Sequence, residues 1–240
     1  MKSPRSIQTE VRTGIERFIL FAEHPAGHDF LRQRQTEMSR LSPKRIAKGA
    51  LLMAYDFQPH VFSHYLRKPF TKAGFEVIGV GSHATVLEDG PSSVLKLYRA
   101  TQAMDEQQLA LRKQQLEQKQ ASLLQYMGKF VTPQVFFIDT HPVYKDTPLL
   151  MATQERVNGT PVNLTEGYTD TNIQVLLESS LVMHDNIQSL PDVIGANNII
   201  ATTEGERIID AIPLVQSDPE DATGYPVALE LIHKAMHSKL

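Results

Sequence analysis

Three residues between positions 192 and 210 have the types and the spacing of a phosphoryl-transfer site. Asp192 lies five residues before Asn197, and Asn197 lies thirteen residues before Asp210. In such a site one carboxylate orients the attacking hydroxyl, while an amide oxygen and a second carboxylate hold Mg²⁺. The spacing therefore predicts phosphoryl-transfer chemistry, and the competing interpretation is a turn-rich hairpin with no catalytic role.

A β-hairpin is predicted between the last two of these residues. Residues 198–200 and 207–209 are short β-prone runs, and residues 202–205 between them are rich in turn formers. The hairpin would fix the separation of Asn197 and Asp210.

A second group of residues lies upstream, in residues 75–99, whose sequence pattern predicts three strands. Small residues follow the first strand and a lysine stands in the third; the pattern consists of Gly79, Gly81, Ala84, Val86 and Lys96. Glycines alone are weak evidence, because tight hairpins use glycine for positive φ without any ligand. The lysine in the third strand makes the pattern more specific than the glycines alone.

Together these features resemble the protein kinase-like superfamily, over about residues 74–214. Asp192, Asn197 and Asp210 resemble the catalytic loop and the metal-binding Asp of that family, and the glycine turn with Lys96 resembles its nucleotide-covering loop and strand lysine. The resemblance implies an α+β protein with a bilobal protein kinase-like fold and a truncated C-lobe, preceded by an N-terminal α-helical extension. The implied division is an extension at 1–70 and a kinase-like domain at 71–240, with an N-lobe at 71–153, a hinge at 154–159 and a C-lobe at 160–240.

The resemblance also implies a role for each residue, with ATP and Mg²⁺ as cofactors. Asp192 would orient the substrate hydroxyl, and Asn197 and Asp210 would hold Mg²⁺. Together with Lys96, these side chains would converge around a single ATP triphosphate. A predicted helix at 105–127 would supply the glutamate that holds Lys96. The remaining implied site residues are Glu117 for that glutamate, with Glu106 as the alternative, and Gly79, Gly81, Ala84, Val86, Glu155 and Val157 for the nucleotide.

The sequence departs from the family at three places. Leu190-Pro191 replaces the His-Arg before the catalytic Asp, Ile194 replaces a lysine that commonly contacts the γ-phosphate, and Ala211-Ile212 replaces the Phe-Gly after the metal Asp. The thirty residues after Asp210 leave no room for a full activation segment. The chain thus resembles the minimal effector kinases of pathogenic bacteria, which implies a protein Ser/Thr kinase of the cytoplasm or of a host cell. The alternative is a pseudokinase that binds nucleotide or protein without phosphotransfer.

The first part of the chain is basic and helical in pattern. Residues 1–72 contain 13 Lys and Arg against 6 Asp and Glu, whereas the rest contains 11 against 21. This asymmetry permits an anionic partner for the extension, and the simpler interpretation is two oppositely charged parts that pack together. His60 and His64 share a helix face but lack a carboxylate beside them, so packing histidines are expected rather than a zinc site.

Several classes of site are excluded by composition and spacing. The chain has no cysteine, which removes disulfides, zinc thiolates and cysteine nucleophiles. No apolar run approaches the ~20 residues of a membrane span. His184-Asp185 is not the catalytic pair, because the residue five positions after Asp185 is Leu190.

Overall fold

The chain divides into two compact units, each described here by itself. The computed structural model describes residues 67–81, 83–164, 170–195 and 197–237. The first unit runs to Gln114 and resumes at Val135–Gln154, and the second consists of Gln115–Gln134 and the chain from Glu155. Nearly all of the predicted extension, with His60 and His64, lies outside the described residues.

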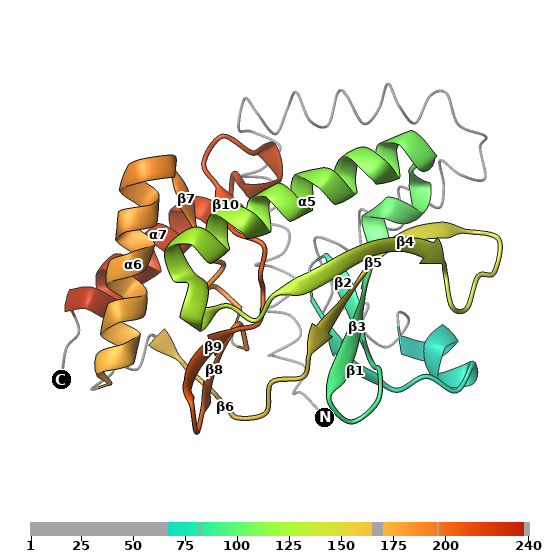
Figure 1. The fold of residues 1–240 in the computed structure, drawn as a ribbon, viewed down its shortest axis with the longest axis horizontal. Coiled ribbons are helices and arrows are strands. Elements are labelled where there is room, and N and C mark those ends of the chain that lie inside the picture. The colour runs from blue at the N-terminus through green and yellow to red at the C-terminus, as the bar shows by residue number, and fades with distance from the viewer. Residues whose placement is uncertain (1–66, 82, 165–169, 196, 238–240) are drawn as a thin grey trace, which may run out of the picture. The chain divides into compact units, whose positions relative to one another are not determined.

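The first unit is built on a five-stranded antiparallel sheet, which contains the three strands predicted in residues 75–99. Its order is β1-β2-β3-β5-β4, and Figure 1 shows these strands as one curved layer. The strands are β1 (Val77–Val80), β2 (Ala84–Glu88), β3 (Ser93–Tyr98), β4 (Gln134–Thr140) and β5 (Pro148–Glu155).

Local turn chemistry and alternating burial explain this sheet. Gly90 has a φ of +80° in the turn between β2 and β3, a conformation that favours glycine. Alternate strand residues point into a core made of Phe70, Leu87, Leu97, Leu149 and Met151. On the opposite face of β2 and β3, Val94 is buried, whereas Val86 and Lys96 are half-buried.

The helix α5 (Glu106–Met127) starts at a capping box and belongs to both units. The Gln108 N–H donates to Asp105 Oδ1 (2.9 Å), and the Asp105 N–H donates to Gln108 Oε1 (3.0 Å). Its second half belongs to the second unit, where Leu123 and Met127 are buried in that unit's core. The predicted N-lobe, residues 71–153, contains the whole helix, whereas the structure divides the helix between the two units.

The second unit combines two helices with two small sheets (Figure 1). One sheet has the order β6-β8-β9, and the other pairs β10 with β7. The elements are β6 (Thr160–Pro161), α6 (Thr171–Ile187), β7 (Ser189–Leu190), β8 (Ile199–Thr202), β9 (Gly205–Ile208), β10 (Leu214–Val215) and α7 (Gly224–His237). The predicted hairpin is confirmed, whereas α7 and the two-residue strands were not predicted.

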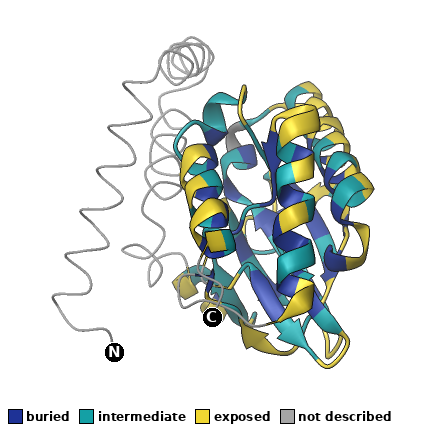
Figure 2. Ribbon diagram, turned by 90° about the vertical axis from the view of Figure 1, so that its left-hand side faces the viewer, coloured by how far each residue is buried: buried dark blue, intermediate teal, exposed yellow. Residues whose placement is uncertain are grey.

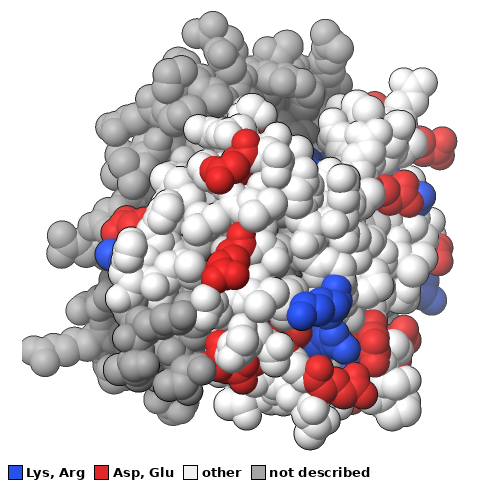
Figure 3. Space-filling view, turned by 60° about the vertical axis from the view of Figure 1, so that its left-hand side comes forward, with Lys and Arg blue, Asp and Glu red and all other residues white. Residues whose placement is uncertain are grey.

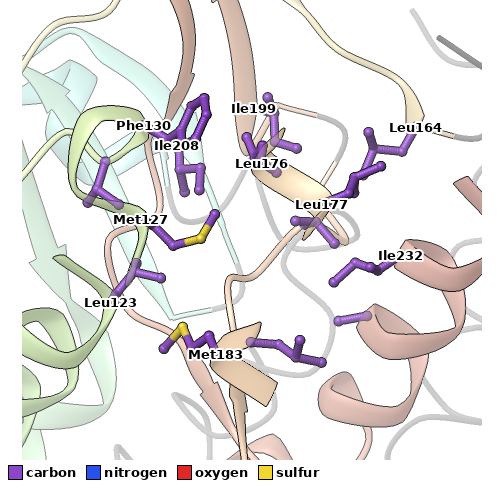
Figure 4. Packing of buried hydrophobic residues seen from close by; sticks show 14 of the residues in the cluster. Leu123, Met127, Phe130, Leu164, Leu176, Leu177, Met183, Ile199, Ile208 and Ile232 are labelled. Atoms are coloured by element: carbon purple, nitrogen blue, oxygen red, sulfur yellow. The ribbon is translucent and has the colours of Figure 1, made fainter. Parts of the chain in front are cut away.

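The core of the second unit joins segments that are far apart in the sequence. Figure 4 shows side chains from the end of α5, from the β8–β9 hairpin and from both α6 and α7 pointing toward one another. The helices in Figure 2 have buried residues on their inner sides and exposed residues on their outer sides. Among the described residues, no helix is long and apolar enough to cross a membrane.

Replacing Gly159 by alanine should destabilise the protein by about 3 kcal/mol, since overpacking against a backbone atom cannot relax cheaply. A Cβ at this position would lie 2.1 Å from the carbonyl oxygen of Ala201 in β8. Gly128→Ala is the matched control, because a Cβ there meets nothing within 4 Å. Urea unfolding of both variants measures the difference; equal midpoints would show that the β6–β8 pairing does not depend on Gly159.

Candidate functional site

A row of predicted site residues crosses three strands of the first unit. Gly79 of β1 is the register partner of Val86 in β2, and Val86 is the register partner of Lys96 in β3. Partners in antiparallel strands share a face of the sheet, so Val86 and Lys96 project on the same side. Both are half-buried. The structure therefore brings together the glycine, valine and lysine that the sequence singled out.

The two predicted glycines are not explained by backbone conformation. Neither Gly79 nor Gly81 has a positive φ. A Cβ on Gly81 would meet only the Ala84 carbonyl oxygen, at 3.8 Å, and a Cβ on Gly79 would make ordinary contact with Val86 at 3.5 Å. Neither position therefore requires glycine for its backbone conformation or for space.

A buried arginine that the sequence analysis missed holds the glycine turn. Arg99, only 3% exposed, donates from Nη2 to the Gly81 carbonyl (2.8 Å) and from Nη1 to Thr85 Oγ1 (3.3 Å). Its backbone N–H donates to the His83 carbonyl (3.1 Å). The residue directly after β3 thus fixes both sides of the turn between β1 and β2. Its position three residues after Lys96 gives no sequence signal for this contact.

In the second unit, Asp192 is held by Asn198 rather than by Asn197. Asn198 Nδ2 donates to the Asp192 carbonyl (2.9 Å), and the Ile194 N–H donates to Asp192 Oδ1 (3.0 Å). Asn197 is exposed, whereas Asn198 and Asp192 are half-buried. The Asn-Asn doublet was the available signal, but only Asn197 matched the expected spacing.

The asparagine amide packs closely against Gly195. A Cβ on Gly195 would lie 2.4 Å from Asn198 Oδ1 and 2.8 Å from its Nδ2. The Asn198 N–H also donates to the Gly195 carbonyl (3.0 Å). Glycine at 195 is therefore what allows the Asn198 amide to reach Asp192.

Asp210 is brought opposite the asparagine doublet by the hairpin. The Ile209 N–H donates to the Asn198 carbonyl (3.0 Å), which extends the β8–β9 pairing by one step toward Asp210. One carboxylate oxygen of Asp210 accepts the Ile212 N–H at 3.3 Å. The backbone thus places an acid and two amides at one end of this hairpin.

The pairing of β7 with β10 completes the arrangement in this unit. Leu214 is the register partner of Leu190, so the segment that leads into Asp192 runs beside the segment that leaves Asp210. Two small sheets therefore gather Asp192, Asn197, Asn198 and Asp210 in one region of the second unit.

The other predicted residues lie at separate places in the chain. Lys96 belongs to the first unit, whereas Glu117, Glu155 and Val157 belong to the second. Glu117 is exposed on α5, and its alternative Glu106 is the exposed first residue of that helix. Glu155 is the exposed last residue of β5, next to the division between the units.

His184 packs against Tyr225 of α7. Its Nδ1 forms a hydrogen bond with the Tyr225 hydroxyl, and the two rings stack at a tilt with centroids 5.9 Å apart. Burial raises the pKa of Tyr225, and the charge of Asp185 adds to that rise. The His184-Asp185 dipeptide thus contributes to the contact between α6 and α7.

The donor set suits a cation that arrives with phosphate better than a preformed metal cage. No cluster of three His, Asp or Glu that could hold a metal exists among the described residues. Asp210 and an asparagine amide supply the one carboxylate and one neutral oxygen that Mg²⁺ takes when phosphate oxygens complete its shell. By residue type alone, these side chains could contribute to a Mg²⁺ site that phosphate oxygens complete.

Figure 3 shows one face on which acidic side chains are dispersed among uncharged ones. The largest basic group in this view lies beside acidic side chains, and smaller basic groups are visible elsewhere on the same face.

A buried ion cluster joins α5 to the chain after Asp210. Lys119 Nζ lies 2.6 Å from Asp218 Oδ2 and 3.0 Å from Asp221 Oδ2, and the three side chains are 15%, 20% and 10% exposed. Burial by itself lowers the pKa of Lys119, but the two carboxylates outweigh burial and raise it above the ordinary 10.5. Burial raises the pKa of Asp221, because repulsion from Asp218 adds to desolvation and the attraction of Lys119 offsets only part of it.

Comparisons with known proteins add no identification. The sequence matches no protein-family model, and a comparison with curated proteins finds no relative. The geometry of the residues is therefore the basis for any functional proposal.

The pKa of Lys119 predicts a pH-dependent contribution to stability. Because the folded pKa exceeds the unfolded value of 10.5, the contribution is complete below pH 10.5 and is lost as the pH rises through the folded pKa. Lys119→Met should lower the free energy of unfolding by about 2–3 kcal/mol at pH 8, since it leaves two buried carboxylates without their cation. Urea unfolding between pH 8 and 11.5 should show this difference shrinking at the alkaline end; a constant difference would contradict the prediction.

Proposed function

We propose that this protein is a Mg²⁺- and ATP-dependent phosphotransferase, most simply a minimal kinase that phosphorylates serine or threonine in a protein. The observation that carries the proposal is the gathering of Asp192, Asn198 and Asp210 at the end of the β8–β9 hairpin. The row of Gly79, Val86 and Lys96 in the other unit supports it independently. The order of these elements along the chain is the order that the kinase resemblance implies.

Asp192 would orient the attacking hydroxyl. The Ile194 N–H holds one carboxylate oxygen, and Asn198 holds the backbone carbonyl of the same residue. With its main chain and side chain both fixed, the carboxylate has few orientations to lose when a substrate hydroxyl binds. Such positioning is the main contribution that a protein makes to phosphoryl transfer.

Asp210 and an asparagine would hold the magnesium ion. Bound Mg²⁺ would supply charge neutralisation for the phosphate oxygens. The sequence spacing assigns the amide to Asn197, whereas the hydrogen bond to Asp192 favours Asn198, whose side chain is already immobilised. We assign the amide role to Asn198 and keep Asn197 as the competing residue.

Lys96 would contact the α- and β-phosphates from β3. Val86 beside it, with the turn formed by Gly79, Gly81 and Ala84, would cover the nucleotide. In the same proposal Glu117 holds Lys96, and the backbone of Glu155 and Val157 meets the adenine edge. Arg99 would support this part of the site indirectly, by holding the Gly81 carbonyl.

One observation favours the pseudokinase alternative. Ile194, where the family has a lysine, is partly buried and packs against the core of the second unit. Its side chain lies close to Gly224 at the start of α7, since a Cβ there would be 3.6 Å from Ile194 Cδ1. The position thus serves packing and supplies no charge, which would leave nucleotide binding without efficient transfer. We also propose an effector-type localisation and an anionic partner for the basic extension.

A phosphotransfer assay separates the two functions. Purified full-length protein with labelled ATP and Mg²⁺ should transfer phosphate to itself or to a generic protein acceptor, and Asp210→Ala should reduce the rate at least about 100-fold by removing a charge-positioning group. Lys96→Met should give a similar loss, and circular dichroism should show both variants folded. ATP binding by calorimetry without transfer above the Asp210→Ala level would support a nucleotide-binding pseudokinase. No ATP binding would exclude the phosphotransferase and leave only a pseudokinase that binds protein.

A matched pair of variants tests which asparagine acts. Asn198→Ala should lower the transfer rate more than Asn197→Ala, because only Asn198 also fixes Asp192. Gly195→Ala should resemble Asn198→Ala, with a loss of about 10- to 100-fold, since its Cβ displaces the amide. A larger loss for Asn197→Ala, with Gly195→Ala close to wild type, would return the metal role to Asn197.

A further inference from the structure

The segment between Asp210 and α7 is short and is anchored throughout. Every residue from Ala211 to Thr223 is described. Backbone groups along it find partners at regular intervals: Gln216 N–H donates to the Gln188 carbonyl (3.0 Å), and Asp218 N–H donates to the Val215 carbonyl (3.0 Å). The segment therefore has a defined conformation in the protein as it stands.

The ion cluster of Lys119, Asp218 and Asp221 is the centre of this anchoring. Asp221 Oδ2 accepts from Lys119 Nζ (3.0 Å) and also from the Val215 N–H (2.8 Å), so one oxygen ties the helix α5 to β10. Asp218 Oδ1 accepts the Glu220 N–H (2.9 Å), which leaves Oδ2 for Lys119. Each carboxylate thus binds the cation and a backbone N–H at once.

The effect of this cluster reaches the proposed site through β10. Val215 is the register partner of Ser189, and Leu214 is the register partner of Leu190, two residues before Asp192. Leu190 and Ala211 are fully buried. Fixing β10 therefore fixes the strand that leads into Asp192 and the chain that leaves Asp210.

The charge arrangement resembles the result of a phosphorylation. Switch segments are commonly ordered when a phosphate, with a charge of about −2, pairs with a basic side chain. Here two carboxylates of the segment present the same charge to Lys119 without any modification. Because the three groups are largely buried, solvent screens their attraction less than it screens exposed pairs.

We propose that Lys119, Asp218 and Asp221 form a permanent lock that holds residues 211–222 in their ordered conformation without phosphorylation. Lys119 is then a positioning residue for Asp192 and Asp210. The catalytic consequence rests on the proposed function, whereas the ordering of the segment does not.

Hydrogen exchange of the full-length protein tests the lock directly. Lys119→Met should speed amide exchange in peptides from residues 211–222 and 187–195 by about 100-fold, as expected for loss of one partner of a buried ion pair. Lys234→Met is the control, because Lys234 forms an exposed pair with Glu230 (2.5 Å) in the same unit. Asp218→Asn is a milder variant if Lys119→Met does not fold, and Lys119→Arg should restore part of the protection. Wild-type exchange in the Lys119→Met and Asp218→Asn proteins would overturn the proposal.

Two kinetic results test the positioning role. Phosphatase treatment, verified by intact mass, should leave the transfer rate of the wild-type protein unchanged, and Lys119→Met should lower kcat while leaving KM for ATP near the wild-type value. A wild-type protein that needs phosphorylation for activity, or a variant that changes only KM, would refute this role. If the wild-type protein transfers no phosphate, the proposed function fails, and the exchange experiment still decides whether the lock exists.

Discussion

The pairing of Ile199 with Ile208 is the constraint on which the candidate site depends. These side chains are 2% and 0% exposed and belong to the same core as α6 and α7. A shift of one residue in either strand would turn the pair away from the core, so burial specifies the register strongly. With this register fixed, Asn198 must face Ile209, and Asp210 must follow at the hairpin end. Apolar contacts thus determine where the polar groups lie.

Local patterns in the sequence predicted the elements well. The three strands from Val77 to Tyr98, the helix after Asp105 and the hairpin around Gly205 follow from alternation, capping and turn residues within short windows. The α+β class was implied by the family resemblance, and the three predicted strands belong to a five-stranded sheet. These features depend on neighbours in the sequence, which is why they could be recognised without coordinates.

The parts that escaped prediction depend on distant partners. Lys119 and Asp221 are 102 residues apart, and neither local sequence indicates that the two side chains form an ion pair. The strands β7 and β10 have two residues each, too few for a periodic signal. The choice between Asn197 and Asn198 depends on a contact with Gly195 that spacing cannot reveal. Tertiary contacts therefore determine which residues of the site lie together, whereas local sequence determines the strands and helices that carry them.

The two compact units also differ in how they use charge. In the first, the buried Arg99 guanidinium is matched to the carbonyl of Gly81 and the hydroxyl of Thr85. In the second, the largely buried ammonium group of Lys119 forms ion pairs with the carboxylates of Asp218 and Asp221. Buried cations remain tolerable only where hydrogen bonds or opposite charge compensate for lost hydration. Both cations fix turns beside proposed site residues. The free-energy cost of removing each cation from water is therefore incurred where the cation fixes the backbone next to those residues.

The path of the chain has a consequence for synthesis on the ribosome. The backbone passes between the units at Gln114, at Gln134 and again at Gln154, so neither unit is a continuous stretch of sequence. Leu123, Met127 and Phe130 emerge well before α6, the β8–β9 hairpin and α7, with which they form a core. At typical rates of about 5–20 residues per second, this apolar surface would wait several seconds for its partners. The nascent chain should accordingly depend on chaperones until α7 has left the exit tunnel.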